Sequence, residues 1–161
     1  MTSELQGKIE YARNIKPHLA ALSRLVARPV CADELLDLAS ARQLRERLRL
    51  LPRGHPKTVA LPFAAMRTEQ FRRFVKALAS AAPQPVQIWT STAEACGPLT
   101  LDSILNFNFN FDFEDEPGGI IALRTADLLD RLLLDFSEED GELELEAEWS
   151  GPRWGAVEYQ E

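Results

Sequence analysis

Aromatic and polar residues alternate strictly through one stretch of this sequence, Ile104 to Gly119, which reads ILNFNFNFDFEDEPGG. A β-strand points successive side chains to opposite faces, so this spacing puts the phenylalanines on one face and the Asn, Asp and Glu residues on the other. Each buried phenylalanine ring removes roughly 150–250 Å² from water, so the apolar face requires a core behind it. We therefore expect a central strand here, and the turn Pro117-Gly118-Gly119 predicts a hairpin with residues 120–124.

Glutamate alternates with apolar residues in a second stretch, from Glu142 to Trp149, which follows a predicted turn at Asp140-Gly141. The even-numbered positions are all glutamate, whereas the odd-numbered positions are Leu, Leu, Ala and Trp. This pattern predicts a second strand with one buried and one acidic face. If both strands lie in the same sheet, the acidic residues of the two strands form a single field.

The rest of the chain divides into helical and strand-like segments. Apolar residues at helical spacing predict helices over 3–14, 17–26, 33–51, 68–80 and 125–133, and β-favouring runs predict strands over 58–61, 86–90 and 152–159. Pro17 is expected to mark a break or a kink between the first two helices, Asp33 to cap the third and Thr68 to cap the fourth. The sequence predicts one α+β domain over residues 1–161. N-terminal helices (1–52) precede an α+β part (57–161), whose mostly antiparallel sheet has helices packed on one face.

Charge is distributed very unevenly along the chain. Residues 1–81 contain 15 Lys and Arg against 7 Asp and Glu, whereas residues 82–161 contain 3 against 18. We expect the acidic half to repel nucleic acid and to attract basic proteins. The arginines Arg42, Arg45 and Arg49 follow one helix face and are interpreted as a solvent-exposed stripe.

Several classes of protein are not expected from this sequence. The N-terminus lacks the apolar core of a signal peptide, so we expect a cytoplasmic protein with no membrane contact. Cys31 and Cys96 are far apart and are expected to be reduced and buried, with no metal or other cofactor. His18 and His55 lie in no recognisable catalytic motif, and His18 is interpreted as an ordinary helix residue. We therefore expect a protein that is not an enzyme.

Three interpretations of the acidic residues remain open. The first is a solvated outer face, and the second is a binding face for a basic protein, for which complementary charge raises the association rate. The third is a metal site, for which carboxylates are suitable ligands, although they lack a loop spacing such as that of the EF-hand. The sequence alone does not decide between them.

The segments NFNFDFEDEPGG (108–119) and DGELELEAEWSGPRWG (140–155) belong to a small acidic α+β chain without catalytic residues. In size and character this chain resembles the immunity proteins of bacterial contact-dependent growth inhibition systems. The resemblance implies a non-enzymatic antitoxin that binds and neutralises a cognate toxin domain, a basic protein and often a nuclease, and that does not bind nucleic acid directly. The residues expected to contact the toxin are Asp112, Glu114, Asp115, Glu116, Glu144, Glu146 and Trp154.

Two other functions compete with this one. A DNA mimic or regulatory protein-binding module would use the same acidic face against a DNA-binding partner. A metal-dependent hydrolase would instead use the clustered carboxylates Asp112, Glu114 and Glu116 to hold a divalent ion.

Overall fold

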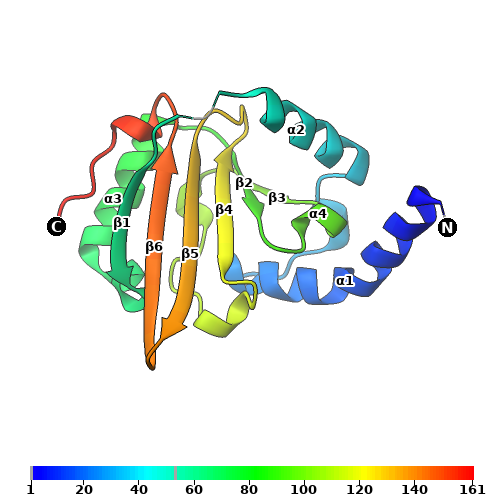
Figure 1. Cartoon of the computed structure of the whole chain (residues 1–161), viewed down its shortest axis with the longest axis horizontal. Helices are drawn as coiled ribbons and strands as arrows, with labels where there is room; N and C mark the ends of the chain where they lie inside the picture. The colour runs from blue at the N-terminus through cyan, green and yellow to red at the C-terminus, as the bar shows by residue number, and fades with distance from the viewer. Residues whose placement is uncertain (1, 53) are drawn as a thin grey trace.

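A computed structural model describes residues 2–52 and 54–161, and within them it contains a six-stranded antiparallel sheet in the order β1-β6-β5-β4-β2-β3 (Figure 1). The strands are β1 (Lys57–Pro62), β2 (Val86–Trp89), β3 (Leu99–Leu101), β4 (Ile120–Thr125), β5 (Arg131–Glu139) and β6 (Glu142–Ser150). The helices are α1 (Ser3–Leu25), α2 (Leu38–Leu50), α3 (Glu69–Ala81) and α4 (Ala93–Cys96). The predicted α+β class, with N-terminal helices followed by an antiparallel sheet covered by helices, is confirmed.

The amphipathic helix α3 covers one face of the sheet, which we call the inner face (Figure 1). Its start is the predicted one, because the Thr68 hydroxyl accepts the backbone N–H of Phe71 at 3.3 Å. The side chains predicted to face inward are buried, and the Phe74 ring lies 4.8 Å from that of Trp149 on β6. Helices α1, α2 and α4 gather at the β2–β3 end of the sheet (Figure 1).

The two predicted N-terminal helices are one helix, α1, which continues through Pro17. The predicted break is wrong because the turns after Pro17 bury Leu22 and Leu25 in the core, and this burial outweighs a proline's cost of about 3 kcal/mol. The cap of α2 is also corrected. Asp37 caps it by accepting the N–H of Ser40 at 2.8 Å, whereas Asp33 lies in a preceding 3₁₀ turn.

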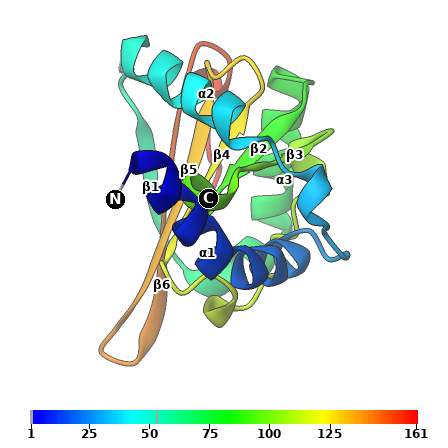
Figure 2. The ribbon, with the colours of Figure 1, turned by 90° about the vertical axis from the view of Figure 1, so that its right-hand side faces the viewer.

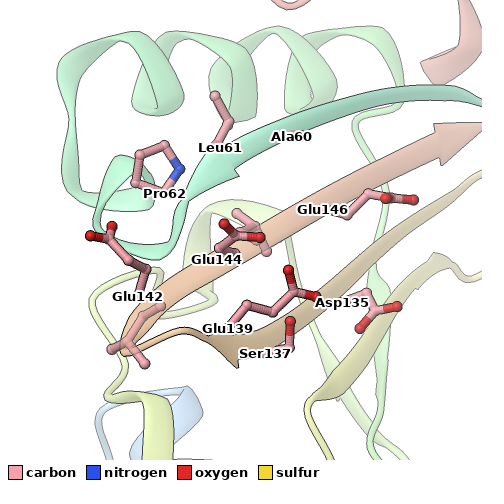
Figure 3. Close-up of a pocket in the computed structure, with 11 residues that line it drawn as sticks. Ala60, Leu61, Pro62, Asp135, Ser137, Glu139, Glu142, Glu144 and Glu146 are labelled. Carbon is pink, nitrogen blue, oxygen red and sulfur yellow. The ribbon is translucent and has the colours of Figure 1, made fainter.

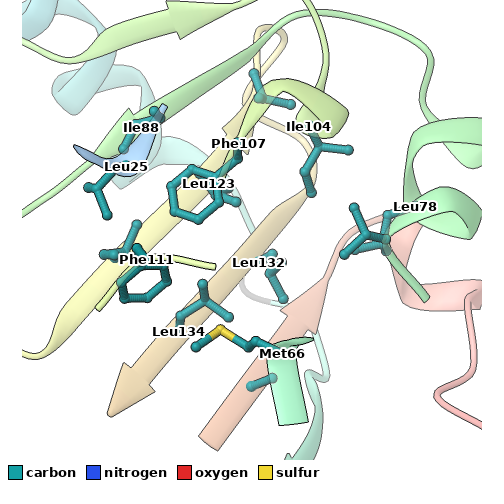
Figure 4. Packing of buried hydrophobic residues seen from close by; sticks show 14 of the residues in the cluster. Leu25, Met66, Leu78, Ile88, Ile104, Phe107, Phe111, Leu123, Leu132 and Leu134 are labelled. Carbon is teal, nitrogen blue, oxygen red and sulfur yellow. The ribbon is translucent and has the colours of Figure 1, made fainter. Parts of the chain in front are cut away.

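The predicted central strand over residues 104–113 does not exist. The segment is a loop with two 3₁₀ turns, Ile104–Asn106 and Phe113–Asp115, that packs on the inner face. Figure 4 shows Phe107 and Phe111 among leucines of β4 and β5. The aromatic side chains are therefore buried or partly buried as predicted, while the backbone conformation is different.

Side-chain and turn hydrogen bonds explain why this segment is not a strand. Asn108 donates its backbone N–H to the Leu25 carbonyl at 2.7 Å, and its side-chain oxygen accepts the N–H of Asn110 at 3.0 Å. The Asp115 carboxylate accepts the N–H of Asp112 at 2.8 Å. Short polar side chains offer the backbone partners that replace a strand ladder.

Because residues 104–113 form no strand, the predicted hairpin with residues 120–124 is also wrong. Strand β4 instead pairs with β2 and β5. The predicted helix over 125–133 is a turn followed by β5, whose Leu132, Leu134 and Phe136 are buried at every second position. After β6, the predicted last strand is replaced by a 3₁₀ turn, Trp154–Ala156, and a tail held by the Trp149 indole N–H on the Val157 carbonyl at 2.9 Å.

Candidate functional site

The outer face of the sheet is strongly acidic over β5 and β6. The register places Glu146 of β6 between Ala60 of β1 and Asp135 of β5, and Glu144 between Pro62 and Ser137. We call the following outer-face side chains the acidic patch: Asp135, Glu139, Glu142, Glu144 and Glu146. Figure 3 shows them along the hairpin that β5 and β6 form, and they line a shallow hollow of about 500 Å³ together with residues of β1.

Nothing within the described residues neutralises the acidic patch. All five side chains are exposed, and none of them forms an ion pair with a described lysine, arginine or histidine. The next glutamate along β6, Glu148, differs because it binds the Arg131 guanidinium at 2.9 Å. The patch therefore has a net charge of −5 when its carboxyl groups are ionised.

The acidic patch extends onto a hairpin that projects beyond its neighbours (Figure 2). The pairing of β1 with β6 ends at Pro62 and Glu144, and that of β4 with β5 at Ile120 and Asp135. Beyond these points the described strand pairing continues only between β5 and β6, apart from the Phe136 N–H, which donates to the Gly119 carbonyl at 2.8 Å. The predicted turn at Asp140-Gly141 is confirmed, with φ of 51° and 79°, the positive values that favour these residue types in two-residue hairpin loops.

The structure separates the predicted contact residues into two groups. Glu144 and Glu146 belong to the acidic patch, whereas residues 112–116 lie on the loop that packs on the inner side of the sheet. Asp112 binds Arg67 at 3.2 Å and Asp115 lies 3.7 Å from Arg24, so these two carboxylates are partly neutralised. The strand faces predicted to form a single acidic field therefore do not do so.

Two predicted contact residues are buried and cannot touch a partner. Glu116 is 3% exposed, and its carboxylate accepts the Ser91 hydroxyl at 2.7 Å and the Gly118 N–H at 3.1 Å. Trp154 is fully buried, and its indole N–H donates to the Leu78 carbonyl at 2.9 Å. Glu116 therefore anchors its own turn, and Trp154 joins the end of β6 to α3.

Sequence reasoning missed Asp135 and Glu139, which belong to the acidic patch. The predicted helix over 125–133 hid the strand in which these residues alternate with buried Leu134 and Phe136. Apolar and polar residues alternate in β5 as they do in β6. Four leucines that also fit helical spacing obscured this alternation in the sequence: Leu128, Leu129, Leu132 and Leu133.

An ion-pair cluster with buried Asp130 at its centre fixes the turn between β4 and β5. Asp130, which is fully buried, accepts the backbone N–H groups of Arg153 and Trp154, each at 2.9 Å, and the Arg153 Nε at 2.7 Å. Asp127 accepts two bonds from the same guanidinium at 2.7 Å. Burial raises the pKa of Asp127, but hydrogen bonds from Thr125 and Arg153 outweigh it and lower that pKa to about 2.

His18 lies in helix α1, as an ordinary helix residue would, but its side chain is buried. Its Nε2 lies 2.8 Å from the Gly97 carbonyl, which can only accept, so Nε2 carries the proton and Nδ1 accepts the Thr92 hydroxyl at 2.6 Å. Burial lowers the pKa of His18, although the hydrogen bond to Gly97 opposes this. Of the two free cysteines, Cys96 is buried as predicted, whereas Cys31 is exposed.

Within residues 2–52 and 54–161, no three His, Cys, Asp or Glu side chains are placed to hold a metal ion together. Asp112, Glu114 and Glu116 therefore do not converge on one ion. No helix in these ranges combines the length and apolar character needed to cross a bilayer. Comparisons with protein-family models, with curated proteins and with solved structures found no match for this chain.

Proposed function

We propose that this chain is a non-enzymatic binding protein whose acidic patch docks against a basic surface of a partner protein. The proposed role is that of a cytoplasmic immunity protein, which neutralises a cognate toxin domain such as a nuclease. The observation that carries the proposal is the acidic patch itself, because five exposed carboxylates, which form no ion pair with any described residue, share one face of a sheet.

A strand pair suits such an interface because the backbone fixes the positions of its side chains. Alternate residues on one strand stand roughly 6.6 Å apart, and neighbouring strands lie about 4.8 Å apart. Binding therefore loses little backbone conformational entropy. This entropy loss is the main penalty when a flexible acidic tail binds. Since these carboxylates form no ion pair within residues 2–52 and 54–161, a basic partner displaces none of the described side chains from them when it binds.

The charge of the patch makes specific demands on the partner. A uniformly negative surface attracts a basic cleft at long range, raises the association rate, and repels nucleic acid that competes for the same cleft. The basic cleft of a nuclease meets these demands. Glu144 and Glu146, which the sequence predicted as contacts, lie at the centre of the proposed interface with Asp135 beside them.

The proposal is tested by charge reversal on the full chain. The patch variant is Asp135→Lys/Glu144→Lys/Glu146→Lys. A matched control, Glu10→Lys/Asp33→Lys/Asp102→Lys, makes the same change of charge at exposed carboxylates outside the acidic patch. Each protein is titrated against toxin domains encoded beside its gene, at ionic strengths of about 0.05 M and about 0.5 M.

We expect the parent to bind a basic toxin domain and to restore growth when the two are co-expressed. Binding should weaken at high salt, fall at least about 100-fold in the patch variant, and change by less than about threefold in the control. Equal binding by patch variant and control would contradict the proposal. Capture of a DNA-binding protein that is not a toxin would support a DNA mimic instead.

A further inference from the structure

The outer face has a second charged feature at the opposite end of β5 from the acidic patch. One register row crosses the sheet there and joins Gln87 of β2, Arg124 of β4, Arg131 of β5 and Ser150 of β6. All four side chains can donate hydrogen bonds, and the row contains no carboxylate. Arg131 is four residues from Asp135, a separation of roughly 13 Å along an extended strand, so this row is distinct from the acidic patch.

Of the three arginines in residues 82–161, only two form ion pairs with described carboxylates. Residues 82–161 contain only three basic residues, all arginine, against 18 acidic ones. Arg153 is neutralised by Asp127 and Asp130, and Arg131 by Glu148. The third, Arg124, makes no ion pair and no side-chain hydrogen bond within the described residues, although it lies in the acidic half.

This arrangement costs stability in the free protein. Arg124 and Arg131 are direct cross-strand neighbours, and like charges in this position repel each other. Burial and the charge of Arg131 lower the pKa of Arg124 to about 10, so both groups remain charged at neutral pH. The Arg131 Nε is also buried, and no described residue accepts a hydrogen bond from it. A buried donor without a partner costs about 1–3 kcal/mol.

We propose that Arg124 and Arg131 form an oxyanion-binding site that takes a carboxylate or a phosphate group. A guanidinium presents paired N–H donors that match either group, and two adjacent guanidiniums offer more donors than Glu148 uses. The Gln87 amide continues the row, since only its oxygen is engaged, by the Trp89 indole N–H at 3.1 Å. A bound oxyanion would relieve the repulsion between the two arginines.

A packing role alone does not account for Arg124. Its alkyl stem covers apolar surface, but leucine or glutamine would cover similar surface without placing a second charge beside Arg131. Both arginines are partly exposed, so an anion can reach them from solvent. The inference is independent of the acidic patch, because it requires no protein partner.

The test measures binding of inorganic phosphate and of acetate to the full chain, with sodium chloride holding the ionic strength constant. Two-dimensional NMR should show saturable shifts of the backbone amides of Arg124, Arg131 and Ser150, with dissociation constants of about 1–10 mM. Amides of α3 should not move. Saturation by one anion only would assign the site to a phosphate or to a carboxylate, and saturation by both would establish a general oxyanion site.

Variants then test whether Arg124 is responsible. Arg124→Gln should raise the dissociation constant of the more tightly bound anion at least about tenfold. Arg124→Lys retains the charge but loses the planar arrangement of N–H donors, so it should raise this constant less. The control Arg72→Gln, which replaces an exposed arginine of α3, should change the dissociation constant of this anion by less than about twofold. If neither anion shifts these amides, or if Arg124→Gln and Arg124→Lys bind as the parent does, the proposal is wrong.

Discussion

The most informative single substitution for stability is Asp130→Ala, which removes the buried carboxylate of the ion-pair cluster. It removes the acceptor for the backbone N–H groups of Arg153 and Trp154 and for the Arg153 Nε. An orphaned buried donor costs about 1–3 kcal/mol, which applies in full to the Trp154 N–H, whereas the two Arg153 donors are partly buried and the guanidinium keeps Asp127 as a partner. We therefore expect the free energy of unfolding to fall by about 3–5 kcal/mol.

Equilibrium unfolding in urea, followed by tryptophan fluorescence, measures this change directly. At about 2–4 °C per kcal/mol for a chain of this size, Tm should fall by roughly 10 °C. The control is Asp135→Ala, an exposed carboxylate without an ion pair, which should change stability by less than about 0.5 kcal/mol. If the two variants unfold alike, the cluster does not fix the β4–β5 turn and our account of it is wrong.

Three further changes test other parts of the fold. Thr68→Ala removes the α3 cap on the N–H of Phe71 and should cost about 1 kcal/mol in urea unfolding. Phe111→Ala empties a fully buried site and should cost about 3–5 kcal/mol in the same assay, and a loss under 1 kcal/mol would contradict the observed packing. The lowered pKa of His18 means that the unfolded chain binds its proton more readily than the folded chain. Stability should therefore decrease as pH falls below about 6.5, and this slope should persist in His55→Ala but disappear in a folded His18→Asn variant.

The elements that sequence reasoning predicted correctly combine a strong pattern with a clear boundary signal. Helix α3 has apolar residues at helical spacing after a capping threonine, Thr68, and β6 alternates without exception after the Asp140-Gly141 turn. Most of the apolar face of each element is buried, although Leu143 at the start of β6 is exposed, so tertiary contacts reinforce the local preference. These are the conditions under which periodicity is a reliable guide.

The wrong secondary-structure predictions concern segments in which two different backbone conformations bury the same side chains. The residues Phe107–Phe113 alternate in a loop as they would in a strand, because asparagine and aspartate side chains supply the backbone partners. Four leucines between Leu128 and Leu133 fit a helix or a strand equally well. The long-range pairing of β5 with β6 decides between them, and it cannot be read from a local window.

The acidic patch was predicted only in part, because local sequence patterns do not show which strands are neighbours. Glu144 and Glu146 follow from the β6 alternation alone, whereas Asp135 and Glu139 require knowledge that β5 is its neighbour. Glu116 and Trp154 were misplaced because a carboxylate or an indole carries no sequence signal for burial when its hydrogen-bond partners are distant in the chain. Ser91 and Leu78 are those partners.

The phenylalanine-rich loop has a consequence for how the chain must fold. Its core, from Leu105 to Phe111, has no proline and no charge and retains the alternation of a strand, which is the composition that favours cross-β stacking between chains. In the native protein, α3 and the sheet cover its aromatic side chains, and turns occupy much of its backbone. When that cover opens, the segment becomes a template for intermolecular pairing, so partly unfolded molecules rather than native ones are the species that aggregate.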